Sequence, residues 1–337
     1  MNSIYKITIA ILFLSGINVQ AQELQTNISV HDPVIIKQDS LYYIFCTGKG
    51  INDWSSKDMV HWKHEKPVFA EAPAWAFNVV PGFDNDIWAP DISFYNGLYY
   101  LYYAVSAFGK NTSAIGVATN TTLHTDDPNY KWVDHGKVIQ SIPGKNNWNA
   151  IDPNLITDEN GKPYLAFGSF WEGLKMVRLQ KNRLKVAQST TNLPTIATRK
   201  KVDERAGNSA DNPVGAGDNA IEAPFIFHKN NYYYLFASID YCCRGINSTY
   251  KMIVGRAEKV QGPYLDEAGT PMAQGGGTIL LQGDKNWYGV GHNAVFTDEN
   301  SDYLVFHGYD ALDNGKPKLR IEKLSWNAAG WPVVASQ

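Results

Sequence analysis

Residues 222–236 read EAPFIFHKNNYYYLF, and this short stretch decides the fold class. A dipeptide and a proline precede an apolar run, a polar turn follows, and an aromatic-rich run completes the unit. Apolar and aromatic runs of this length on either side of a turn predict two short β-strands rather than a helix.

The same unit occurs five times along the chain, at intervals of roughly 60 to 70 residues. The anchors that begin the units are His31-Asp32-Pro33, Trp88-Ala89-Pro90, Ile151-Asp152-Pro153, Glu222-Ala223-Pro224 and Gly291-His292-Asn293. A third strand is expected in most units, over SAIGVATN (113–120), GLKMVRL (173–179), YKMIVGRAE (250–258) and KLRIEKLSW (318–326). Repeated small sheets predict an all-β, five-bladed β-propeller, formed as a single domain by residues 22–337.

The repeat has a consequence for function. The first strand of each blade lines the axis of a propeller, so the residues that begin these strands should meet at one end of the channel. In three units the anchor holds a carboxylate, from Asp32, Asp152 and Glu222. A single Asp-Pro is ordinarily only a turn, but three carboxylates in phase with one repeat indicate a shared functional pocket.

Carboxylates that share a pocket support acid–base chemistry, because burial and like charges separate their pKa values. Glycoside hydrolysis needs one group to protonate the leaving oxygen and another to activate water or attack carbon. Trp88, Phe170 and Trp171 lie beside the anchors and are expected to stack on sugar faces. A sugar-binding propeller without catalysis is the alternative, because it would keep the aromatic side chains.

Composition restricts the class of protein further. The 337 residues carry a net charge of −3, and 44% are hydrophobic, which excludes a disordered chain. There is no polybasic face, so nucleic acid and anionic membranes are poor partners. Three cysteines form no zinc spacing. We expect Cys46, Cys242 and Cys243 to be buried free thiols, with a disulfide between the adjacent pair or one that uses Cys46 as the alternatives.

The first 21 residues have the pattern of a secretory signal. Lys6 precedes the apolar run from Ile7 to Leu14, and Val19-Gln20-Ala21 supplies small residues for cleavage after Ala21. No later apolar stretch is long enough to span a bilayer. We therefore expect a protein without a membrane span, exported to the periplasm or medium.

Nine segments together resemble glycoside hydrolase family 43, and most closely its secreted endo-1,5-α-L-arabinanases. They are HDP (31–33), TGKGINDWSSKDMVHW (47–62), VPGFDNDIWAPDIS (80–93), YYAVSAFGKNTSAIGVATN (102–120), WNAIDPNLI (148–156), FGSFW (167–171), IEAP (221–224), CCRGINSTYKMIVGR (242–256) and GGGTILL (275–281). The resemblance implies a five-bladed propeller that cleaves internal α-1,5 linkages of arabinan. Exo-acting α-L-arabinofuranosidases and β-xylosidases share this fold and remain alternatives. Fructan-cleaving propellers do not match, because their Asn-Asp-Pro, Arg-Asp-Pro and Glu-Cys signatures are missing.

The resemblance also implies roles for individual residues. Asp32 corresponds to the general base, Glu222 to the general acid, and Asp152 to a third carboxylate that tunes the acid's pKa. Such enzymes invert the anomeric centre, so the base and acid should lie about 6.5–9.5 Å apart. Implied substrate contacts come from Asp32, Trp88, Gly116, Asn149, Ala150, Ile151, Asp152, Ser169, Phe170 and Trp171.

His292 holds the fifth anchor. A lone histidine at the start of a strand is often only a hydrogen-bonded core residue. The resemblance nevertheless implies that His292 lies beside a calcium ion on the axis, with water completing most of its shell. The partner is then a polysaccharide, arabinan or its oligosaccharides, and we expect a monomer. A long polar segment, 195–219, and Glu172 depart from the family pattern. We expect the segment to be a solvated loop that borders the cleft.

Overall fold

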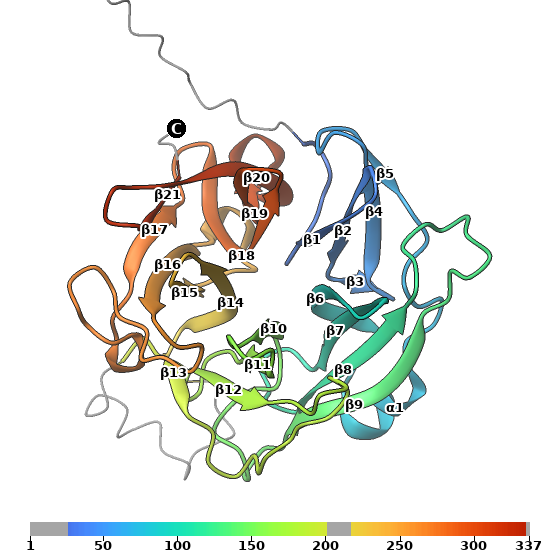
Figure 1. The fold of residues 1–337 in the computed structure, drawn as a ribbon, viewed down its shortest axis with the longest axis horizontal. Coiled ribbons are helices and arrows are strands. Elements are labelled where there is room, and N and C mark those ends of the chain that lie inside the picture. The colour runs from blue at the N-terminus through green and yellow to red at the C-terminus, as the bar shows by residue number, and fades with distance from the viewer. Residues whose placement is uncertain (1–25, 201–216, 335–337) are drawn as a thin grey trace, which may run out of the picture.

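The computed structural model describes residues 26–200 and 217–334, which form five small antiparallel sheets arranged as a ring (Figure 1). The predicted signal peptide, residues 1–21, lies outside the described residues. Each sheet is one blade, and the innermost strands β1, β6, β10, β14 and β18 surround the centre of the ring. The predicted all-β, five-bladed propeller is therefore confirmed.

The stretch of chain that forms the first blade adds one short strand to the second blade. The first blade consists of β1 (Val34–Gln38), β2 (Leu41–Cys46), β4 (Asn52–Ser56) and β5 (Trp62–His64). The second blade consists of β3 (Gly48–Lys49), β6 (Asp86–Tyr95), β7 (Leu98–Ser106), β8 (Ser113–Asn120) and β9 (Val133–Ser141). Because β3 follows β2 directly yet pairs with β6, the chain links these two blades by backbone hydrogen bonds. The helix α1 (Ala74–Val79) lies at the rim beside β8.

The other three blades each have four strands in sequence order. The third contains β10 (Asn154–Thr157), β11 (Pro163–Phe167), β12 (Leu174–Arg178) and β13 (Thr195–Ala197). The fourth contains β14 (Ile221–Lys229), β15 (Tyr232–Ile239), β16 (Lys251–Ala257) and β17 (Thr278–Gln282), with the 3-10 helices η2 (Gly245–Asn247) and η3 (Met272–Gln274) in its loops. The fifth contains β18 (Trp287–Asp298), β19 (Ser301–Asp310), β20 (Lys316–Trp326) and β21 (Pro332–Val334), with η4 (Ala311–Asp313) between β19 and β20.

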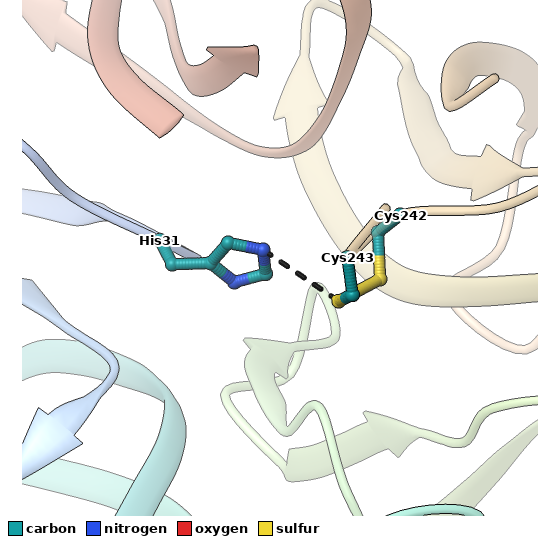
Figure 2. A group of neighbouring side chains, drawn as sticks. All are labelled: His31, Cys242 and Cys243. Carbon is teal, nitrogen blue, oxygen red and sulfur yellow. Dashed lines mark hydrogen bonds between the residues drawn. A yellow bond between two sulfur atoms is a disulfide. The ribbon is translucent and has the colours of Figure 1, made fainter. Parts of the chain in front are cut away.

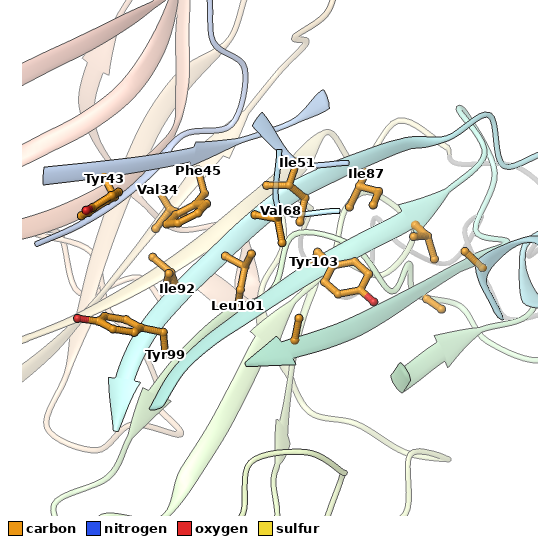
Figure 3. Packing of buried hydrophobic residues seen from close by; sticks show 14 of the residues in the cluster. Val34, Tyr43, Phe45, Ile51, Val68, Ile87, Ile92, Tyr99, Leu101 and Tyr103 are labelled. Carbon is orange, nitrogen blue, oxygen red and sulfur yellow. The ribbon is translucent and has the colours of Figure 1, made fainter. Parts of the chain in front are cut away.

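The hydrophobic core is divided among the five interfaces between neighbouring blades. Figure 3 shows one of them, where Val34 and Phe45 of the first blade pack against Ile92 and Leu101 of the second. Four further clusters fill the remaining interfaces in the same way. Truncating one of these buried side chains to alanine should cost about 2–5 kcal/mol of unfolding free energy. Packing between blades, and not within one sheet, therefore holds the ring together.

Side chains and the N-terminal segment close the ring between its first and last blades. Lys37 Nζ lies 2.6 Å from Asp298 Oδ1, and the Tyr42 hydroxyl donates to Asp298 Oδ2 at 2.5 Å. The amide of Leu319 in β20 also donates to the carbonyl of Ile28 at 3.1 Å. The two ends of the described chain are thereby joined although no strand crosses between these two blades.

Each of the five anchors contains one residue with a left-handed backbone. The φ angles are 54° at Asp32, 44° at Ala89, 56° at Asp152, 55° at Ala223 and 52° at His292. Non-glycine residues seldom adopt this conformation, and it is concentrated at functional sites. In β6, β14 and β18 the pairing with the next strand shifts register at this point. The repeat thus produces the same local kink five times around the centre.

Candidate active site

The three predicted carboxylates come together at the centre of the ring. Burial is high for Asp32 and Asp152, which are 8% and 6% exposed. Glu222 and Asp32 both act electrostatically on Asp152, so all three lie within one polar cluster. Their positions in the repeat are not identical, however. Asp32 and Asp152 are the left-handed residues of their anchors, whereas Glu222 precedes the left-handed Ala223. The prediction that all three occupy one equivalent position is therefore wrong by one residue for Glu222.

Asp32 is surrounded by donors. Its Oδ1 atom lies 2.8 Å from His31 Nδ1 and 2.9 Å from His292 Nδ1, and its Oδ2 accepts a hydrogen bond from Thr47 Oγ1 at 2.6 Å. Burial alone would raise the pKa of Asp32, but the charges and hydrogen bonds of His31 and His292 outweigh burial. The net pKa lies well below its ordinary value, so Asp32 is ionised at neutral pH.

A third histidine fixes the backbone of Asp32. The amide of Asp32 donates to His307 Nδ1 at 3.1 Å, so this nitrogen carries no proton. His307 is completely buried and stacks on His31, with ring centroids 4.0 Å apart. Burial, followed by the charge of His31, lowers the pKa of His307 well below its ordinary value. His307 is therefore a neutral hydrogen-bond acceptor, a role that no motif in the sequence indicates.

Asp152 has the opposite protonation. Burial raises its pKa to about 8; His292 opposes this rise, whereas the charges of Glu222 and Asp32 add to it. Its Oδ2 accepts from the amide of Ala223 at 3.0 Å, which ties the third anchor to the fourth. The hub, formed by Asp32, Asp152 and Glu222 at the centre of the ring, thus contains two carboxyl groups, those of Asp32 and Asp152, that differ in charge at neutral pH. Acid–base catalysis requires such an arrangement.

Glu222 is held by hydroxyl groups. Ser169 Oγ donates to Glu222 Oε2 at 2.7 Å, and the backbones of these two residues also form a bridge. Tyr250, which directly precedes β16, is fully buried, and its hydroxyl forms a hydrogen bond with Glu222. Burial, together with the charge of Glu222, raises the pKa of Tyr250 well above its ordinary value. Glu222 therefore sits between two donors that hold its carboxyl group in one orientation.

The predicted aromatic contacts differ in exposure. Trp88 and Phe170 are partly exposed, and Trp88 contacts Phe108 whereas Phe170 contacts Tyr241, so both keep ring surface that a sugar could reach. Trp171 is only 5% exposed. Its carbonyl accepts from Asn219 Nδ2 at 2.8 Å, and its ring has little surface for a sugar. A stacking role for Trp171 is therefore not supported, because protein atoms cover this side chain.

The other predicted contacts are also largely covered. Ser169 serves Glu222, whereas Asn149, Ala150 and Ile151 are all less than 10% exposed. Ala150 is completely buried and its amide donates to Ser141 Oγ. Gly116 lies in the middle of β8, where a Cβ atom would meet the rings of Tyr103 and Trp75. A side chain at Gly116 would have no room beside these rings, and sugar contacts at Gly116 and Ala150 stay predictions.

The ends of the 195–219 segment are not a solvated loop. Residues 195–197 form β13, and the side chains of Thr198 and Asn219 are fully buried and joined by a hydrogen bond of 3.1 Å. Residues 201–216 lie outside the described residues. Glu172, the other departure from the family pattern, forms an ion pair with Lys175 at 3.3 Å.

His292 is the candidate metal ligand. Its pKa is raised to about 9, since the charges of Asp32, Asp152 and Glu222 outweigh the lowering effect of burial. Within the described residues, no protein group forms a hydrogen bond with its Nε2 atom. The side-chain amide of the next residue, Asn293, is buried and likewise has no partner among the described residues. The buried Asn293 amide leaves a polar group for a ligand beside His292, and a calcium ion would bind the Nε2 atom only of the neutral imidazole, with water as most of its shell.

The cysteines contradict the favoured prediction in part. Cys46 is a buried free thiol, as predicted. Cys242 and Cys243 instead form a disulfide between adjacent residues, which was the alternative (Figure 2). The disulfide lies beside His31, with Cys243 Sγ 3.8 Å from His31 Nε2. It is therefore part of the surroundings of Asp32.

Comparison with known proteins agrees with this geometry. The sequence profile of glycosyl hydrolases family 43 matches residues 26–332. An extracellular exo-α-(1→5)-L-arabinofuranosidase of Cellvibrio japonicus is 47% identical over 91% of this chain and 86% of its own length. An extracellular endo-α-(1→5)-L-arabinanase of Bacillus subtilis is 44% identical over 91% of this chain and 88% of its own.

A solved structure agrees as well. The Cellvibrio cellulosa α-L-arabinanase complexed with arabinohexaose superimposes with a TM-score of 0.87 at 48% identity, over 91% of this chain and 95% of the other. The family profile spans almost all of the described residues, and the relatives are far above the level that similarity of fold alone would give. The chain is therefore a glycoside hydrolase, and it belongs to glycosyl hydrolases family 43.

Proposed function

We propose that this protein hydrolyses internal α-1,5-L-arabinofuranosyl linkages in arabinan, with inversion at the anomeric carbon. The observation that carries the proposal is the hub itself, where Asp32 is ionised and Asp152 retains a proton beside Glu222. The names of the relatives supply the sugar and the linkage, since both are named for α-1,5-arabinan.

Asp32 acts as the general base. Its carboxylate is ionised at neutral pH and is held by His31, His292 and Thr47, so its orientation does not depend on the substrate. A water molecule between Asp32 and the anomeric carbon loses a proton to the carboxylate as its oxygen attacks. A separation of about 6.5–9.5 Å between base and acid, needed to admit this water, remains a prediction.

Glu222 acts as the general acid and Asp152 as its partner. Burial raises the pKa of Asp152 to about 8, and the charges of Glu222 and Asp32 add to the rise that His292 opposes, so Asp152 keeps a proton beside Glu222 near neutral pH. Glu222 transfers a proton to the departing arabinosyl oxygen as the glycosidic bond breaks. Ser169 and Tyr250 hold the Glu222 carboxyl group in position and stabilise the carboxylate that is left.

Exo action is the second candidate, because one of the relatives is named an exo-acting enzyme and is 47% identical to this chain. The two modes differ in the shape of the cleft beyond the hub. Time-resolved sizing of the products from linear arabinan separates them. Endo action gives a spread of short oligosaccharides in the first minutes, whereas exo action gives one small product from the start.

Calcium completes the proposed site. His292 and Asn293 would hold the ion, which when bound would add positive charge that favours ionised carboxylates at the hub.

Export through the signal in residues 1–21 fits the extracellular relatives. A monomeric state stays a prediction. No helix in the described part of the chain has the length and apolar character of a membrane span.

The proposal is tested by measuring hydrolysis of linear arabinan, branched arabinan and arabinoxylan by the mature protein and its Asp32→Asn variant. The wild-type protein should release arabino-oligosaccharides from linear arabinan, and the variant should be slower by about 10²–10⁴-fold. Activity on arabinoxylan alone, or full activity of the Asp32→Asn variant, would contradict the proposal.

A further inference from the structure

A chain of hydrogen bonds connects the Cys242–Cys243 disulfide to Asp32. The disulfide lies in the loop between β15 and β16 on the fourth blade, and Figure 2 shows the imidazole of His31 facing Cys243. The amide of Cys243 donates to the Tyr309 hydroxyl at 2.7 Å, and that hydroxyl lies 2.8 Å from His31 Nε2. His31 Nδ1 in turn lies 2.8 Å from Asp32 Oδ1.

The hydrogen bonds of this chain orient His31 toward Asp32. Tyr309 accepts from the Cys243 amide, and burial raises the pKa of Tyr309 so that its hydroxyl keeps its proton. The hydroxyl donates to Nε2 of a neutral His31 or accepts from Nε2 of a charged one, and in both cases the protonated Nδ1 faces Asp32. Each group therefore fixes the orientation of the next one.

The chain begins at a backbone amide whose position depends on the disulfide. A bond between adjacent cysteines closes a small ring that includes the peptide between them, so rotation about that peptide's neighbouring bonds is restricted. Cys243 has a φ of 64°, a conformation that a non-glycine residue seldom keeps unless its surroundings enforce it. Opening the ring would allow the Cys243 amide to turn away from Tyr309.

We propose that the Cys242–Cys243 disulfide is a positioning element for the catalytic base, acting through Tyr309 and His31. This inference rests on the proposed role of Asp32. The disulfide itself does not touch the reacting atoms, and its effect is to keep the His31 imidazole in the orientation that holds the Asp32 carboxylate. Loss of the disulfide should therefore slow the chemical step more than it weakens substrate binding.

The first test compares the oxidised and reduced protein. Cys243 is exposed, so a phosphine reductant can reach the disulfide in the folded protein. Thiol counting in denaturant should rise from one thiol, Cys46, to three. We expect kcat on arabino-oligosaccharides to fall roughly three- to tenfold, the equivalent of one net hydrogen bond, with KM within about twofold. Reoxidation should restore kcat, and a Cys242→Ser/Cys243→Ser variant should reproduce the reduced protein.

The second test asks whether the effect passes through Tyr309. Tyr309→Phe removes the hydroxyl that joins Cys243 to His31, so this variant should have a lowered kcat that the reductant barely changes. Tyr264→Phe is the matched control. It removes a buried hydroxyl that, among the described residues, hydrogen-bonds to the carbonyl of Val260, in the loop between β16 and β17 and away from the disulfide. The control should keep wild-type kcat and wild-type sensitivity to the reductant.

Three results would overturn the inference: kcat unchanged on reduction, a rise in KM alone, or equal sensitivity of the Tyr309→Phe and Tyr264→Phe variants to the reductant. The role of Asp32 is checked separately. If Asp32→Asn is as active as wild type, the proposed function fails; if Asp32→Asn is inactive while reduction has no effect on kcat, only the disulfide inference fails.

Discussion

Replacing Glu222 with glutamine tests the division of roles at the hub most directly. Glutamine has nearly the same shape, and its amide oxygen can still accept from Ser169 Oγ at the position of Oε2. The substitution therefore removes the transferable proton while leaving the local geometry intact. General acid catalysis is typically worth about 10²–10⁴-fold, which corresponds to about 2.7–5.4 kcal/mol of transition-state free energy.

The loss should depend on the leaving group. An arabinosyl alkoxide needs a proton as the bond breaks, so hydrolysis of an unmodified arabino-oligosaccharide should fall by the full factor. A 4-nitrophenolate departs without a proton, so hydrolysis of a 4-nitrophenyl arabino-oligosaccharide should fall by less than about tenfold. Asp32→Asn should slow both substrates alike, because the attacking water needs its base in either case.

The assay is the ratio of kcat/KM on the two substrates for wild type, Glu222→Gln and Glu258→Gln. Glu258 is an exposed glutamate that neighbours β16 and serves as the matched control. Oligosaccharide binding by Glu222→Gln, measured by calorimetry, should stay close to that of a catalytically impaired Asp32→Asn protein. An equal loss of kcat/KM on both substrates would refute the assignment of Glu222 as the acid.

Three further predictions concern stability, pH and metal. Asp152→Asn should lower kcat and should raise the melting temperature, by an amount that grows from about pH 4 to pH 8. The pKa of Asp152 in the folded protein is raised to about 8, so the wild-type protein loses stability as pH rises through this window, whereas the uncharged variant does not. A gain in melting temperature that is the same at all pH values would contradict this. Asp298→Ala should lower the unfolding free energy in urea by about 1–3 kcal/mol, because Lys37 loses its partner at the ring closure, whereas Asp126→Ala, an exposed control, should change it little. Exhaustive chelation should lower activity or the melting temperature and calcium should restore it, while a His292→Ala protein responds to neither; elemental analysis that finds no calcium would contradict the site.

The fold followed from the sequence because the repeat is a local pattern. The hairpins predicted from the anchors match β1–β2, β6–β7, β10–β11, β14–β15 and β18–β19, and the third strands match β8, β12, β16 and β20. The offset within an anchor could be read from the sequence, because Asp32 directly precedes Pro33 whereas Glu222 lies two residues before Pro224; only the backbone shows that the position of Ala223 is the left-handed one.

Other parts of the site depend on contacts between distant residues. Tyr309 and His307 belong to the second strand of the fifth blade, where aromatic residues ordinarily indicate core packing, so their contacts with His31 and Asp32 had no local signal. Trp171 is buried, and its carbonyl accepts from Asn219, which is remote in sequence. The pairing of Cys242 with Cys243 was weighed as an alternative, but sequence alone could not decide between it and two free thiols.

The five left-handed anchors separate the scaffold from its chemistry. Three of them present acidic or imidazole groups, but Ala89 and Ala223 hold the same backbone with a bare methyl group. Both are almost completely buried, so the ring repeats the same backbone conformation at two positions that carry no chemical group. An engineer who placed a new metal ligand or nucleophile at either alanine would find the backbone strain already accommodated, but would have to make room among the buried neighbours.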